Sequence, residues 1–237
     1  MVNRFDAFVL EALKSWAGHS YIIDSAVAFL ASSELLKGAV FISVLWWYWF
    51  RGGDAAVVRR TREHLSCTLI AGIVAIVVAR ALALLLPFRV RPRFESSLDF
   101  STAKNVGTYF VDWSSFPSDH AVLFAALAVG FGFVSLRLGV LAFIYMLIVI
   151  VFPRMYLGYH YPTDILVGLA IGIVIGYGFN TTRFRRWLAG PIMQWEQHAP
   201  SSFYVMMFIV SFQVATMFTS LRTIALGAVH FAERVLK

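Results

Sequence analysis

Long apolar runs separated by short polar segments dominate the pattern along this chain. Runs near residues 65–86, 120–136, 138–153, 163–180 and 201–221 are mostly free of charge, and a sixth candidate covers about 35–50. A helix that crosses a bilayer needs about 20 apolar residues, with roughly 17 as the lower limit. The set predicts an all-α, polytopic transmembrane helical bundle of about six spans.

The N-terminal region has a different pattern. Residues 4–16 place apolar side chains at helical spacing, with Arg4, Asp6 and Lys14 elsewhere, which is typical of a helix lying in the membrane interface. The first apolar run is too short for a cleaved signal peptide. Residues 21–31 are apolar but contain Asp24, so the pattern leaves open whether they span or only dip into the membrane. We therefore expect an interfacial or re-entrant region at 1–34 and a transmembrane domain at 35–237.

Composition supports a membrane protein. Of the 237 residues, 59% are hydrophobic and 14% are charged, which is outside the usual balance of soluble domains. The net charge of +7 comes from Lys and Arg residues that lie between the spans, without the aromatic platform of a nucleic-acid-binding surface. Cys67 is the single cysteine, which excludes a disulfide within the chain and a zinc cluster built from thiolates.

The positive charges also predict the orientation of the spans. If the spans alternate, one face carries the larger set, namely Arg51, Arg59, Arg60, Arg62, Arg137, Arg183, Arg185 and Arg186. The opposite face carries Arg89, Arg91, Arg93, Lys104 and Arg154. The positive-inside rule then places the first face in the cytoplasm. Glycines 168, 172 and 176 recur every four residues, a spacing that favours close helix packing, within one subunit rather than across a dimer interface.

Two short stretches on the second face have the composition of helix starts. Ser118 is a favourable N-cap before the run that begins near His120, and Pro162 suits a first helical turn, with Asp164 behind it. Helix N-termini attract phosphate, and the arginines of this face supply guanidinium groups that suit phosphate oxygens. The polar segment at 115–121 is therefore predicted to form part of an anion-binding site.

Histidines complete this candidate site. His160 and Asp164 are four residues apart, a spacing at which the carboxylate can hold one ring nitrogen and leave the other free as nucleophile or base. His120 stands at the other helix start and can supply a proton to a leaving group. Each feature alone has a plain structural explanation, but their convergence favours a site. The other histidines, at positions 19, 64, 198 and 230, lack such neighbours and are interpreted as structural.

These residues resemble a known family. Pro117-Ser118-Asp119-His120 and Arg154-x5-His160-x3-Asp164 are similar to the second and third signature motifs of the type-2 phosphatidic acid phosphatase superfamily. That superfamily includes integral membrane lipid phosphatases and soluble vanadium haloperoxidases, and the present composition argues against the latter. The second motif usually reads Pro-Ser-Gly-His. The form with aspartate is similar to the bacitracin-resistance type of undecaprenyl-pyrophosphate phosphatase, and the resemblance covers roughly residues 80–180.

The first family motif, Lys-x6-Arg-Pro, is incomplete. Arg91-Pro92 supplies its end, but Leu84 stands where the lysine belongs. Arg80, Arg89 and Lys104 are the candidates to replace that cation, and Arg80 is favoured.

The resemblance implies a mechanism and a substrate class. His160 would form a phosphohistidine, Asp164 would orient it, and His120 would act as acid and base. Phosphate would be bound by a larger set of side chains: Arg91, Ser118, Arg154, Arg80, Asp119 and Arg89. No metal and no cofactor are expected, because arginines supply the positive charge.

The expected substrate is a lipid phosphate, most specifically undecaprenyl pyrophosphate. Phosphatidate, phosphatidylglycerol phosphate and lipid A phosphatases, and a lipid phosphotransferase, remain alternatives. A transporter is less favoured because the charges sit at span ends rather than near the midplane. The expected location is the bacterial inner membrane, with the active site on the periplasmic face. Besides substrate and membrane lipids no partner is expected, and the oligomeric state stays open.

Overall fold

The structure is a computed structural model that describes residues 2–98 and 113–219. Within these ranges it is helical, with no β-strand. The α-helices are α1 (Arg4–Lys14), α2 (Tyr21–Ser32), α3 (Val40–Phe50), α4 (Ala55–Leu85), α5 (Asp119–Val134), α6 (Leu136–Tyr145), α7 (Phe152–Tyr156), α8 (Pro162–Asn180), α9 (Thr182–His198) and α10 (Pro200–Ala215). Short π-helical segments are η1 (Leu35–Ala39) and η4 (Met146–Val151), and 3-10 turns are η2 (Pro92–Phe94) and η3 (Ser96–Leu98). The predicted all-α class is confirmed.

The six predicted apolar runs coincide with helices. Among the described residues, three helices are long and apolar enough to cross a membrane: α4, the continuous Leu136–Tyr156 and α8. A fourth span is possible by length if α2 and Leu35–Phe50, which meet at a 66° bend, count as one. Helices α5 and α10 are apolar but shorter than these spans. Six spans therefore fit the arrangement, whereas length alone establishes three or four.

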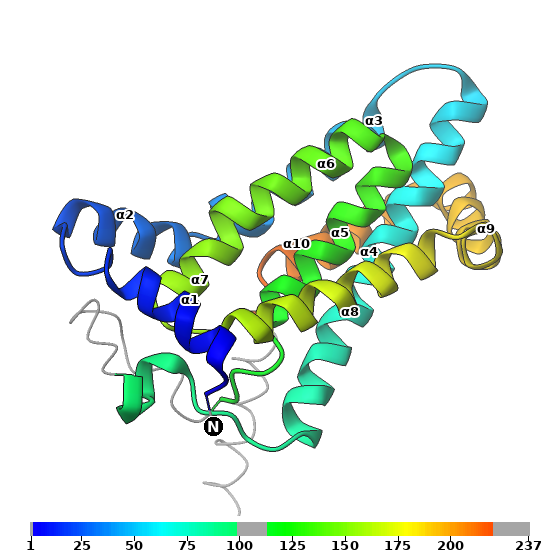
Figure 1. The fold of residues 1–237 in the computed structure, drawn as a ribbon. Helices are drawn as coiled ribbons and strands as arrows, with labels where there is room; N and C mark the ends of the chain where they lie inside the picture. The colour runs from blue at the N-terminus through cyan, green and yellow to red at the C-terminus, as the bar shows by residue number, and fades with distance from the viewer. Residues whose placement is uncertain (1, 99–112, 220–237) are drawn as a thin grey trace, which may run out of the picture.

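Helix α5 is the centre of the bundle and packs against α4, α6 and α8 (Figure 1). Glycines on α8 allow a close approach to α5. A Cβ atom at Gly172 would lie 2.3 Å from the Val122 carbonyl oxygen, and one at Gly176 would lie 2.6 Å from that of Ala126. The glycine repeat thus serves helix packing within the subunit, as predicted.

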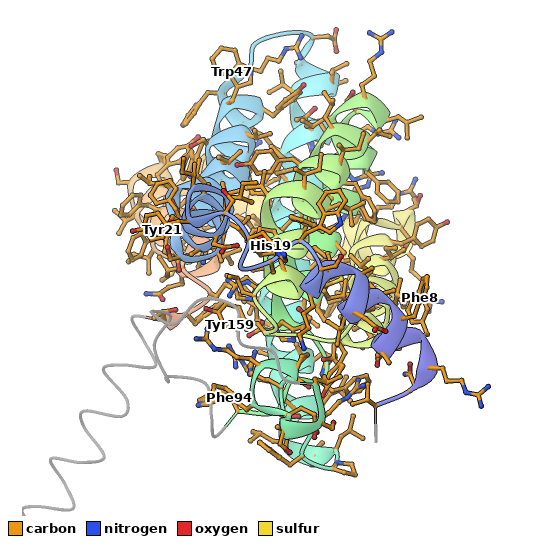
Figure 2. All side chains as sticks on the ribbon, turned by 60° about the vertical axis from the view of Figure 1, so that its left-hand side comes forward. Phe8, His19, Tyr21, Trp47, Phe94 and Tyr159 are labelled. Carbon is orange, nitrogen blue, oxygen red and sulfur yellow. The ribbon has the colours of Figure 1, made fainter. Side chains whose placement is uncertain are left out.

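The bundle has two chemically different ends. At one end, the start of α4, the end of α5 and the junction of α8 with α9 come together. Arg185 forms an ion pair with Glu63 at 3.2 Å, and the His64 ring stacks on Phe133. At the other end lie the starts of α5 and α8, with α1 packed against α7 and α8 (Figure 1). Trp47 and Phe94 lie near opposite ends of the molecule (Figure 2).

Helix α1 is amphipathic and docks through a polar contact. Its Asp6 carboxylate is fully buried and accepts hydrogen bonds from the backbone N–H and the hydroxyl of Thr163, at 2.9 and 2.7 Å. Phe5 and Phe8 are exposed on the helix, and Phe8 projects away from the bundle (Figure 2). The buried acid fixes the helix over the start of α8, while the exposed aromatic side suits the membrane interface.

Helix α9 was not predicted, because charged side chains interrupt its apolar residues. It is held by an ion pair between Glu196 and Arg62 at 2.6 Å.

Candidate active site

The two helix starts singled out in the sequence are joined directly. The backbone N–H of Ser118, the N-cap of α5, donates to the carbonyl of Asp164 in the first turn of α8 at 3.2 Å. The backbone N–H of Ser115 donates to the carbonyl of Arg89 at 2.9 Å, which ties in the segment after α4. Segments far apart in sequence thereby form one polar cluster at this end of the bundle.

His160 lies in a tight turn between α7 and α8. Gly158 has φ of 66°, a left-handed conformation that favours glycine. The backbone N–H groups of Tyr159 and His160 both donate to the Arg154 carbonyl, at 2.9 and 3.3 Å. The turn therefore fixes the histidine relative to Arg154, and its side chain is buried.

The ring of His160 is oriented by a backbone carbonyl. Its Nδ1 atom lies 2.7 Å from the carbonyl oxygen of Ser115. Because a carbonyl only accepts, Nδ1 carries the proton and Nε2 keeps its lone pair. The nearest Asp164 oxygen lies 4.0 Å from Nδ1. The expected carboxylate–histidine hydrogen bond is thus not formed, because His160 precedes α8 and helical spacing does not apply to it.

Burial and charge keep His160 neutral. The pKa of His160 lies well below its ordinary value, first because the ring is buried and then because the positive charge of Arg91 opposes protonation. A neutral imidazole with a free Nε2 is the form that a nucleophile requires.

His120 contacts two charged neighbours. Its Nδ1 lies 2.7 Å from the Asp119 carboxylate, and its Nε2 lies 2.6 Å from an Nη atom of Arg154. Since Arg154 can only donate, Nε2 accepts in this arrangement and Nδ1 donates to Asp119. Arg154 also donates to the Ala31 carbonyl at 3.1 Å, which connects the site to α2. An anion held by Arg154 is thus within reach of His120.

Asp119 and Arg80 form an ion pair at 2.6 Å, and the Arg80 guanidinium lies 4.9 Å from the centre of the Trp113 ring. Both residues were predicted to contact phosphate. The carboxylate is shared between His120 and Arg80, so it supports the histidine and connects Arg80 to it, while both phosphate contacts stay predictions.

Arg89 occupies a position between two carboxylates. It forms ion pairs with Asp6, at 2.7 Å, and with Asp164, and its guanidinium stacks over the Tyr161 ring. Asp164 also accepts from the Tyr161 backbone N–H at 2.8 Å, which caps α8. Arg89 thus connects α1 and α8, and its phosphate contact stays a prediction. Asp6 was missed, because contacts between residues so distant in sequence have no local signal.

Arg91 and Ser118 are buried in the cluster. Arg91 donates to the carbonyls of Tyr159, at 3.0 Å, and Trp113, at 3.2 Å, on either side of the histidine turn. Ser118 makes no side-chain capping hydrogen bond, although it is the N-cap of α5. The predicted residues Arg91, Ser118, Arg154, His120 and His160 are therefore gathered at one place.

Lys37 is a further cation that sequence reasoning missed. It is buried in η1, forms an ion pair with Glu34 at 3.2 Å, and interacts electrostatically with Arg154 and Asp119. Its only sequence signal was a lone lysine within an apolar run. Lys104, another candidate for the missing first-motif cation, lies outside the described residues.

The chemistry of the cluster follows from these contacts. In the part of the chain that the structure describes, no group of three or more His, Cys, Asp or Glu side chains is placed to hold a metal ion. The cluster combines a neutral, oriented histidine, a second histidine beside a carboxylate, and buried guanidinium groups. Such a set can hold an oxyanion and transfer a phosphoryl group to nitrogen and then to water.

Comparisons with known proteins agree with this chemistry. The family model described as the PAP2 superfamily matches residues 60–188. Undecaprenyl-diphosphatase BcrC of Bacillus subtilis (strain 168) is 26% identical over 171 residues, which cover 72% of this chain and 80% of that protein. The crystal structure of Aquifex aeolicus LpxE is similar in fold, with a TM-score of 0.52 and 21% identity, and the match covers 73% of this chain and 92% of that one.

Proposed function

The chain belongs to the PAP2 superfamily, and from this premise we propose that it is an integral membrane lipid phosphatase that cleaves undecaprenyl pyrophosphate to the monophosphate and inorganic phosphate. The similarity to an undecaprenyl-diphosphatase supports the choice of substrate. So does Asp119, the residue that distinguishes this second motif from the commoner form with glycine.

One observation carries the proposal: the orientation of His160 beside buried arginines. Its Nδ1 is bound to the Ser115 carbonyl, which leaves Nε2 as the nucleophile, and Arg91 and Arg154 are both close enough to act on its charge. Electrostatic stabilisation by such preorganised cations is usually the largest contribution in phosphoryl transfer.

In the first step, Nε2 of His160 attacks the terminal phosphorus. A nitrogen–phosphorus bond forms, the bond to the bridging oxygen breaks, and the lipid monophosphate leaves with that oxygen. Arg91, Arg154 and Ser118 hold the phosphoryl oxygens. When Arg154 turns from Nε2 of His120 to the substrate, that nitrogen is free to carry the proton taken from water in the preceding turnover, and it donates this proton to the leaving oxygen. Asp119 stabilises the imidazolium through Nδ1. Asp164, 4.0 Å from Nδ1 of His160, stabilises the positive charge that develops on the ring.

In the second step, His120 works as a base. Its Nε2 accepts a proton from water, the water oxygen attacks phosphorus, and the nitrogen–phosphorus bond breaks. Inorganic phosphate leaves and His160 returns to its neutral form. The positive charge comes from side chains of the chain itself, so we propose that the reaction proceeds without a metal ion.

The experiment that tests this function measures phosphate release by the purified full chain from a panel of lipids at equal surface concentration. The panel holds undecaprenyl pyrophosphate, undecaprenyl phosphate, phosphatidate, phosphatidylglycerol phosphate and phosphorylated lipid A. The ratio of kcat/KM values reports differential transition-state binding. We expect the pyrophosphate to be preferred. A preference for any of the monophosphates would transfer the assignment to that lipid, and transfer of phosphate to an added lipid acceptor would identify a phosphotransferase.

A further inference from the structure

A polar cavity lies at the end of the bundle opposite the candidate active site. It has a volume of about 210 Å³, and the residues that line it come from the start of α4, the end of α5 and the junction of α8 with α9. Its polar lining consists of Arg60, His64, Asn180, Thr181, Thr182 and Arg185, and Phe133 and Tyr177 complete its wall. The cavity shares no residue with the candidate active site. From Asp164 to Asn180, along α8, the two sites are separated by about 24 Å at 1.5 Å per residue.

The acceptors at this cavity are largely satisfied. The last carbonyls of α8 receive hydrogen bonds within the same junction: Asn180 donates to Gly176 at 3.0 Å, the Thr181 backbone donates to Tyr177 at 3.1 Å, and the Thr181 hydroxyl donates to Gly178 at 2.8 Å. The negative end of α8 is therefore capped from within the protein.

The donors are in surplus. Helix α9 begins at the cavity and has no side-chain capping hydrogen bond, so N–H groups of its first turn lack helical acceptors. Arg60 is exposed and forms no ion pair with any residue in 2–98 or 113–219. Arg185 is paired through Nη1 with Glu63, but its buried Nε has no hydrogen-bond partner within the same residues. Guanidinium groups beside a helix N-terminus favour an oxyanion.

His64 is the second, independent indication of a ligand. The residue is 3% exposed, its Nδ1 lies 3.0 Å from the Asn180 side-chain oxygen, and its ring stacks on Phe133. The amide oxygen only accepts, so Nδ1 donates and Nε2 of the neutral ring is an acceptor. This Nε2 is buried and has no partner among the described residues. A buried polar atom without a partner is costly, so His64, interpreted from the sequence as structural, calls for a ligand that donates a hydrogen bond.

We propose that this cavity binds a phosphate-containing ligand that carries both a negative charge and a hydroxyl donor. The charged oxygens meet Arg60, Arg185 and the first turn of α9, and the hydroxyl donates to Nε2 of His64. The cavity is smaller than the roughly 300 Å³ typical of sites for drug-sized ligands, so it suits an ion or a head group rather than a whole organic ligand. Basic pockets between transmembrane helices are known to bind anionic lipid head groups.

Two sources supply this chemistry. Inorganic phosphate at near-neutral pH carries charge and hydroxyl together, and the head group of phosphatidylglycerol carries a charged phosphate beside glycerol hydroxyls. In both cases the ligand binds where the core helices α5 and α8 end and near where α4 begins. The opposite ends of these three helices lie toward the candidate active site. The proposal concerns binding and does not depend on the reaction proposed above.

The test measures thermal unfolding of the full chain in detergent micelles. In one arm, inorganic phosphate replaces chloride at constant ionic strength; in the other, phosphatidylglycerol replaces phosphatidylcholine in the mixed micelle. A ligand that binds the folded state raises Tm as its concentration passes Kd.

The variant is Arg60→Gln, which removes a lining charge without breaking an ion pair of the described residues. The matched control is Arg183→Gln, which removes the same charge from an exposed position of α9 outside the cavity. His64→Phe keeps an aromatic ring against Phe133 and removes the Nε2 acceptor, together with the Nδ1 donor to Asn180.

Wild type and Arg183→Gln should respond alike, and phosphate bound at the active site contributes equally to both. Arg60→Gln and His64→Phe should each require about fivefold to tenfold more ligand for the same rise in Tm, as expected for one lost polar contact at a partly solvated site. A difference seen with inorganic phosphate identifies a free anion as ligand, and one seen only with phosphatidylglycerol identifies a head group. If both variants follow Arg183→Gln in both arms, the cavity binds neither and the proposal is wrong.

Discussion

Replacing Asp119 by asparagine separates two roles for this carboxylate. Asparagine keeps the size of the side chain and an oxygen that can accept from Nδ1 of His120, but it removes the negative charge. If Asp119 supports His120, the loss should slow the proton transfers. If it contacts the substrate phosphate, as the sequence suggested, the change should act on binding instead.

The expected magnitude follows from the contact geometry. The carboxylate lies 2.7 Å from Nδ1, so protonated His120 forms a charge-assisted hydrogen bond that becomes a neutral one in the variant. Charge-assisted hydrogen bonds are about twice as strong as neutral ones. The variant should therefore lose at least about 1–1.5 kcal/mol of stabilisation of protonated His120. Unit charges about 4 Å apart interact by about 4 kcal/mol at an effective dielectric constant of 20, which sets an upper bound. Because the side chains of both residues keep some exposure, at 14% and 17%, the loss should lie toward the lower bound. We expect kcat to fall about tenfold to a hundredfold.

The assay compares kcat and KM for Asp119→Asn with those of Asp54→Asn, a matched loss of one carboxylate. Asp54 caps α4 by accepting from the Ala56 backbone at 2.9 Å, a bond that asparagine preserves, and it lies at the opposite end of the bundle. Both variants should unfold near the wild-type Tm. Only Asp119→Asn should lose kcat, with KM changed less than about threefold.

A large change in KM at constant kcat would refute this reasoning, because it would place Asp119 against the substrate. An unchanged kcat would likewise show that His120 needs no charged partner.

Three further predictions concern cations, inhibitors and orientation. Lys37→Met should lower kcat/KM about tenfold while Lys37→Arg keeps most of it, because a buried cation beside Arg154 contributes to anion binding; an unchanged Lys37→Met protein would remove this residue from the site. Vanadate should inhibit as a mimic of the five-coordinate transition state, whereas EDTA should not; loss of activity in EDTA that magnesium restores would contradict the metal-free reaction. In a Cys67→Ala background, an impermeant thiol reagent added to intact cells should label Ser96→Cys and not Ala56→Cys, both of which are exposed positions; the reverse pattern would invert the proposed orientation.

The sequence predicted the helices well, because continuous apolar runs leave little choice of structure. Among the described residues, each of the six runs is mainly helical, and the repeat of Gly168, Gly172 and Gly176 was correctly assigned to packing within the subunit. The sequence did not predict the 66° bend between α2 and the following helical segment, because residues 33 and 34 include no proline or glycine to indicate a break.

The sequence predicted which side chains of the candidate site come together better than it predicted their individual contacts. Motif spacing brought His120, His160, Arg91 and Arg154 together correctly. The hydrogen-bond partner of Nδ1 in His160 is a backbone carbonyl, however. Every residue has one, so the amino-acid sequence does not show which carbonyl binds the ring. The connection from Asp6 through Arg89 depends on how α1 docks, which periodicity within α1 does not specify.

The most direct test of the central claim is detection of the phosphorylated enzyme. Purified protein is mixed with undecaprenyl pyrophosphate labelled in its terminal phosphate, quenched in alkali within milliseconds, and digested for mass spectrometry. We predict phosphate on the peptide that contains His160, on a histidine nitrogen, and neither phosphoenzyme nor turnover in His160→Ala. A His160→Ala protein that releases phosphate at a near wild-type rate would contradict the mechanism.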